Sequence, residues 1–148
     1  MTQNQHILDT LTEQVQCYAR LAKLAEIQHE CVQNNQTDEL LNVLMQRQTV
    51  LEQISFHENT IGPVKKRWVE FVGELPETDR AGAENLLGET RRLLEQITQS
   101  DRNDTMILQQ RKLNLGKQIN QATQARQVNR SYAAAAYGRP ASRMDIQR

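Results

Sequence analysis

The stretch Leu8–Val32, LDTLTEQVQCYARLAKLAEIQHECV, decides the fold. A stripe that is apolar except for one histidine recurs in it at alternating spacings of three and four residues, and consists of Leu8, Leu11, Val15, Tyr18, Ala22, Ala25, His29 and Val32. This spacing is the seam of a coiled coil, in which one helix packs along another. We therefore predict a helix over about residues 4–33, followed by a turn at the polar triplet 34–36.

The rest of the chain predicts two further long helices. The second helix is expected over about residues 38–61, with Thr37 as its cap. Its apolar stripe consists of Leu40, Leu41, Leu44, Leu51, Ile54 and Ile61. Because proline lacks the amide hydrogen that a helix interior uses, we expect this helix to kink or break near Gly62-Pro63, with a short segment at 63–72. The third helix is expected over about residues 79–136.

Composition agrees with an all-α chain. The 148 residues include only 6 Gly and 3 Pro, and aromatic residues make up 4%. Few aromatic side chains suit a narrow helical seam better than a thick globular core. We predict an elongated antiparallel bundle of three long helices over residues 1–138, with residues 139–148 as a disordered basic tail.

Localisation and charge restrict the classes of function. The N-terminal residues lack the pattern of a secretory signal, and no apolar run approaches the ~20 residues of a membrane helix, so a cytoplasmic protein without stable membrane insertion is expected. Cys17 and Cys31 lie too far apart on one helix for a disulfide and should be free thiols. Residues 111–148 carry eight basic residues and one acidic residue. Nucleic acid is not the expected partner, because the basic helical part has no aromatic side chains for base stacking.

Motifs for catalysis or cofactor binding are not evident. Glu26 and His29 have the Glu-x-x-His spacing of metal-binding bundles, but a second such motif is missing, so we predict no metal, no cofactor and no enzymatic activity. Trp68 and Phe71 are interpreted as closing one end of the bundle, with a partner-binding role as the alternative. Asp101 and Asp104 are either specificity determinants within the seam or part of an exposed face.

Several of these residues give the chain a family likeness. They are the run Thr37-Asp38-Glu39-Leu40-Leu41, then Arg47-Gln48, then Asp101 and Asp104 before Ile107-Leu108, and finally Tyr137-Gly138. In this order the chain resembles FlgN-type flagellar export chaperones. The resemblance implies a small protein without catalysis that escorts hook–filament junction subunits to the flagellar type III export gate. It also implies that the C-terminal part of the third helix grips the cargo.

That part of the chain is amphipathic, but its apolar face has too few large side chains to form a core by itself, which fits partner binding. The candidate partner-binding residues are Leu108, Leu115, Ile119, Ala122, Ala125, Val128, Tyr132 and Tyr137. Components of the export gate and its ATPase are further candidate partners, and homo-oligomerisation is left open. The main alternative is a structural or scaffolding coiled-coil protein with no export role, and a helical nucleic-acid binder is a third.

Overall fold

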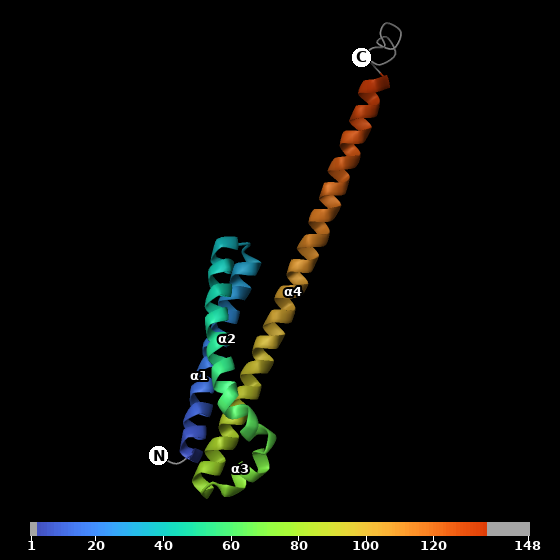
Figure 1. Ribbon diagram of the computed structural model, residues 1–148. Helices are drawn as coiled ribbons and strands as arrows, with labels where there is room; N and C mark the ends of the chain where they lie inside the picture. Colours follow the sequence, from blue (N-terminus) through green and yellow to red (C-terminus); the bar gives the residue numbers. More distant parts are fainter. Residues whose placement is uncertain (1–2, 136–148) are drawn as a thin grey trace. The chain divides into compact units, whose positions relative to one another are not determined.

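A computed structural model describes residues 3–135 of the chain, and this part contains four α-helices and no strand. They are α1 (Gln3–Gln33), α2 (Thr37–Lys66), α3 (Trp68–Glu74) and α4 (Glu77–Ala133), shown in Figure 1. The all-α prediction is confirmed. The helices number four rather than three because residues 68–74 form a helix of their own.

The α1–α2 turn lies where the polar triplet predicts it. Asn35 adopts φ 56°, a left-handed conformation that asparagine tolerates better than most residues. The predicted cap at Thr37 is wrong, since Gln36 is the capping residue, makes no side-chain capping bond, and Thr37 is already helical. Three side-chain hydrogen bonds join Gln14 to Glu58, Arg20 to Gln53, and Arg47 to Gln28. From one pair to the next the residue number in α1 rises while the residue number in α2 falls, so α1 and α2 run antiparallel.

Of the two outcomes predicted at Gly62-Pro63, a kink or a break, the break does not occur there, because α2 continues through Pro63 to Lys66. Pro63 removes one helical hydrogen bond, but Ile61 is completely buried and Val64 packs against the same apolar cluster. We attribute the persistence of the helix to this packing on both sides of the proline. The backbone leaves helical geometry at Arg67 (φ −121°, ψ 40°), and α3 begins at the next residue.

The chain divides into two compact units, residues 1–107 and 108–148. The first has two apolar clusters, of which the one at its α3 end contains Ile7, Leu11, Ile61, Phe71, Leu75 and Ala83. Trp68 packs at the edge of this cluster with its ring centroid 5.5 Å from that of Phe71, and its Nε1 donates a hydrogen bond to Glu84 Oε1. The aromatic pair therefore closes this end of the first unit.

The second cluster draws on three helices and includes Tyr18, Leu21 and Ala22 of α1, Val50 and Ile54 of α2, and Leu93 and Ile97 of α4. Because α1 contacts two helices rather than one, its buried face is wider than a single seam. Cys17 and Cys31, which the heptad pattern places outside the seam, are both free thiols and both buried.

The predicted stripe of α2 is wrong in part. Ile54 and Ile61 are buried, but Leu41, Leu44 and Leu51 are exposed and Leu40 is only half-buried. The first unit instead buries Val43 and Val50, which continue the heptad spacing of Ile54 and Ile61. A second apolar face of α2 is consequently left open to solvent.

Residues 108–135, the described part of the second unit, contain no comparable core. From residue 105 to residue 135, no side chain of the described chain is buried. The structure differs here from the expected single bundle over residues 1–138. The apolar side chains of residues 105–135 are too sparse to enclose one another. Tyr137 and the expected tail at 139–148 lie outside the described residues.

Candidate functional site

The C-terminal segment of α4, residues 108–135, exposes a series of large apolar side chains. Leu108, Leu113, Leu115, Ile119, Val128 and Tyr132 are each between 44% and 70% exposed. Ala122 and Ala125 are exposed as well. Single exposed apolar residues are common on protein surfaces, but a contiguous set on one helix indicates an interaction site.

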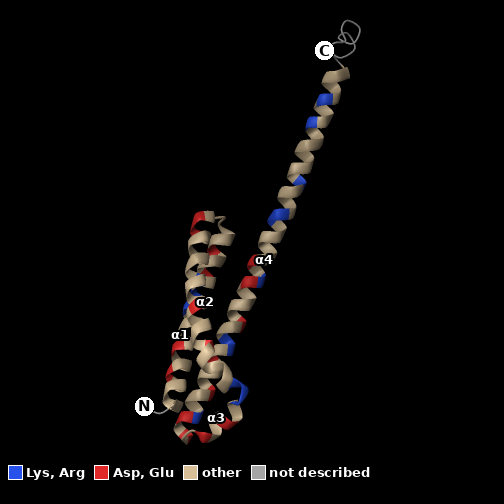
Figure 2. Cartoon of the chain, in the orientation of Figure 1, with Lys and Arg blue, Asp and Glu red and all other residues tan. Residues whose placement is uncertain are grey.

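The same segment is basic. Its charged residues are Arg111, Lys112, Lys117, Arg126 and Arg130, and it contains no Asp or Glu. Figure 2 shows this C-terminal part of α4 with blue but no red residues, whereas red residues are frequent on α1 and α2. A partner that combines apolar side chains with acidic ones would match this surface best.

The predicted partner-binding residues do not all share one face of a straight helix. Leu108, Leu115, Ile119 and Ala122 lie on one side, because their successive spacings are seven, four and three residues. From Ala122 to Val128 the spacing is three twice in succession, which shifts Val128 and Tyr132 around the helix. A partner helix that contacts all of them must wind left-handed around α4. Leu113 is not among the predicted partner-binding residues, and it faces away from Leu115 and Ile119.

A polar cluster joins α1, α2 and α4 within the first unit. Asp104 is only 2% exposed, and its two carboxylate oxygens contact His29 Nδ1 at 2.6 Å and Gln28 Nε2 at 2.9 Å. Of the two interpretations of Asp104, the exposed face is therefore wrong. A buried carboxylate is tolerated only where donors satisfy it, and both donors come from α1.

Asp101, one turn earlier on α4, is held by Arg47 of α2. Two parallel hydrogen bonds of 2.8 and 2.9 Å join the guanidinium to the carboxylate, and Arg47 Nη1 also donates to Gln28 Oε1. The hydrogen bonds to Asp101 raise the pKa of Arg47, against the opposing effect of burial, and both aspartates add a favourable charge interaction. Sequence analysis missed this pairing, because residues 47 and 101 share no local pattern.

Metal binding has no support in this cluster. In the described part of the chain, no group of three or more His, Cys, Asp or Glu side chains is arranged to hold a metal ion. His29 instead contacts Asp104, while Glu26 of the Glu-x-x-His pattern is exposed. The arrangement fixes helices against one another rather than presenting an open coordination site.

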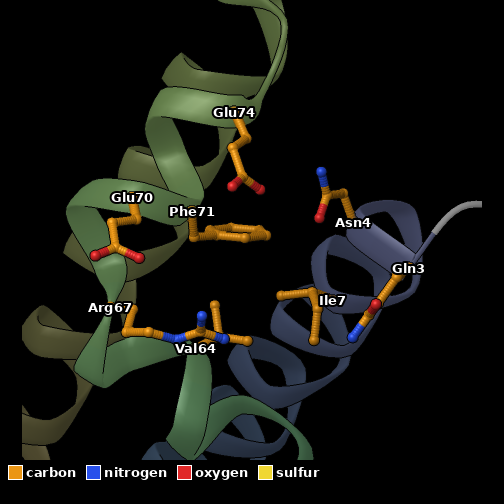
Figure 3. A pocket seen from close by; sticks show the side chains of 8 residues that line it. All are labelled: Gln3, Asn4, Ile7, Val64, Arg67, Glu70, Phe71 and Glu74. Atoms are coloured by element: carbon orange, nitrogen blue, oxygen red, sulfur yellow. The ribbon is translucent and has the colours of Figure 1, made fainter.

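A small pocket lies where the start of α1 meets α2 and α3. Figure 3 shows the Ile7 and Phe71 side chains pointing toward each other, and Arg67, Glu70 and Glu74 also line the pocket. Ile7 and Phe71 belong to the buried end cluster, so the apolar part of the pocket is the edge of the core. The volume of about 130 Å³ is well below the ~300–1,000 Å³ that is usual for small-molecule sites.

Two further findings bear on function. Across residues 3–135, no helix combines the length and the hydropathy that a membrane span requires. Comparison of the chain with protein-family models, with curated proteins and with solved structures finds no match. The exposed basic and apolar segment of α4 is therefore the candidate functional site.

Proposed function

We propose that the chain is a cytoplasmic, non-enzymatic export chaperone of the FlgN type, built as an antiparallel bundle of three long helices. It binds the C-terminal helical segments of hook–filament junction subunits, prevents their premature assembly and delivers them to the flagellar export apparatus. The observation that carries the proposal is the set of large apolar side chains exposed along residues 108–132 of α4. The family resemblance of the sequence supplies the identity of the cargo.

The mechanism is coupled folding on binding. The cargo segment is disordered before assembly and becomes helical when its apolar side chains pack against Leu108, Leu115 and Ile119, then Val128 and Tyr132. Ordering such a segment offsets ~2–5 kcal/mol of the interaction energy, which keeps the affinity moderate and the cargo releasable. No cofactor takes part, and the α4 surface acts only by covering apolar cargo side chains.

A scaffolding coiled-coil protein is the second candidate function. It is favoured by one observation, the exposed apolar residues of α2, which include Leu41, Met45 and Phe56. Such a protein would associate with itself or with other helices and would not distinguish flagellar subunits from unrelated segments.

Calorimetric titration separates the two candidates. The full chain is titrated with C-terminal segments of the two hook–filament junction proteins of the same genome, and with the corresponding flagellin segment as the control. The export chaperone binds the junction segments selectively, with a negative heat-capacity change from buried apolar surface. A folded chain that binds none of the three segments would favour the scaffold.

A further inference from the structure

The exposed face of α2 has a regular pattern of its own. Its residues repeat at spacings of three and four and are all exposed: Asp38, Leu41, Met45, Gln48, Glu52 and Phe56. Three are large and apolar, and Met45 and Phe56 are 71% and 70% exposed. We call this row the α2 outer row. It has the seam spacing of a coiled coil but lacks a partner helix.

The C-terminal segment of α4 carries a row with the same spacing and the opposite charge. It consists of Leu108, Lys112, Leu115, Ile119, Ala122 and Arg126, and all six are exposed. We call this the α4 outer row. Both rows hold two charges fourteen residues apart, acidic at 38 and 52 and basic at 112 and 126.

From this match we propose that the α4 outer row of one molecule packs against the α2 outer row of a second copy of the chain. In the antiparallel register Glu52 faces Lys112 and Asp38 faces Arg126. Three apolar pairs then fall opposite one another, Met45 with Ile119, Leu41 with Ala122, and Phe56 with Leu108, while Leu115 faces Gln48. The two charge pairs occupy positions within the rows, on either side of the pairs 41/122 and 45/119, where polar residues of a seam set the register of the pairing.

The charges on both rows are available for this contact. Within residues 3–135, Asp38, Glu52, Lys112 and Arg126 take part in no ion pair. Arg47, the basic residue of α2 nearest to the row, is already bonded to Asp101. The α2 outer row therefore presents acidic charge to a partner, and the α4 outer row presents basic charge.

The contact is heterologous, since it joins two different surfaces of the chain, and each copy carries both. Self-association would cover Leu108, Leu115 and Ile119. If the proposed function holds, cargo and a second copy would then compete for α4, and the unloaded chaperone would shield its own apolar surface. The self-association itself does not depend on the identity of any cargo.

Charge exchange tests the proposal. One variant carries Lys112→Glu and Arg126→Glu, and the other carries Asp38→Lys and Glu52→Lys. Sedimentation equilibrium of the full chain at low salt should show a mass that rises with concentration above the single-chain 17.1 kDa. Each variant alone should associate at least tenfold more weakly, because its two rows now bear like charges.

The decisive measurement is an equal mixture of the two variants, because the acidic α2 outer row of one variant then meets the basic α4 outer row of the other. Association should return to that of the original chain. Lys117→Glu reverses a single charge about half a turn away from Leu115 and Ile119 on α4 and should leave association unchanged. A single-chain mass at every concentration, or association that the charge variants neither weaken nor restore, would overturn the proposal. No cargo is present, so a failure here is distinct from a failure of the chaperone function.

Discussion

A chain truncated after Gln118 should lose cargo binding while its first unit stays folded. The truncation removes Ile119, Val128 and Tyr132, which are 57%, 50% and 70% exposed and are free to be covered by a partner. Full burial of such a side chain contributes about 1.5–3 kcal/mol. Even partial burial of the three predicts an affinity at least a hundredfold weaker, equivalent to about 2.7 kcal/mol.

The readout is calorimetric titration with the junction segment that binds the full chain best. Fluorescence of Trp68, the single tryptophan, reports independently that the first unit remains folded, because Trp68 packs on its end cluster. A matched pair in the full-length chain excludes a trivial effect of length. Ile119→Asp should reproduce most of the loss, whereas Asn120→Asp adds the same charge on the adjacent residue and should change affinity little. Unchanged affinity in the truncated chain would show that Ile119, Val128 and Tyr132 do not bind the cargo.

The second large effect concerns stability. Asp104→Ala should lower the free energy of unfolding of the first unit by about 3 kcal/mol, because it breaks a buried and hydrogen-bonded charge cluster. His29 and Gln28 lose the carboxylate that they contact at 2.6 and 2.9 Å. His29 is about one third exposed, so water can replace part of its interaction and the loss should not reach the upper end of such effects.

Urea unfolding followed by Trp68 fluorescence measures this loss within the first unit. Glu95→Ala is the control, since Glu95 is an exposed acidic residue on the same helix. It should shift the unfolding free energy by less than about 0.5 kcal/mol. A similarly small shift for Asp104→Ala would show that the cluster does not stabilise the fold.

The helices could be predicted because their signals are local. The seam of residues 8–32 predicts α1 to within one residue at its start, and the polar triplet predicts the turn. The break after α2 was harder to place, since it depends on the packing of Ile61 and Val64 and not on Pro63 alone. Local backbone chemistry indicates where a helix can end, but tertiary contacts decide whether it does.

Buried faces were harder to predict than helices. In α2 both Leu44 and Val43 are apolar and adjacent, and either could begin a seam, but only the register with Val50 meets the other helices. The Arg47–Asp101 pair could not be foreseen, because the two residues meet only through the register of α2 against α4. The apolar stripe of α4 was visible in the sequence as spacing, and its exposure is what the structure adds.

Hydrogen exchange of the full chain, alone and saturated with a junction segment, tests the central claim most directly. Amides of an exposed helix exchange through local opening, and a bound partner suppresses that opening. The chaperone account predicts at least tenfold slower exchange over residues 108–132 on binding, with little change in α1 and α3. Unchanged exchange over 108–132 when the segment is bound would contradict it, since the cargo would then lie on another surface.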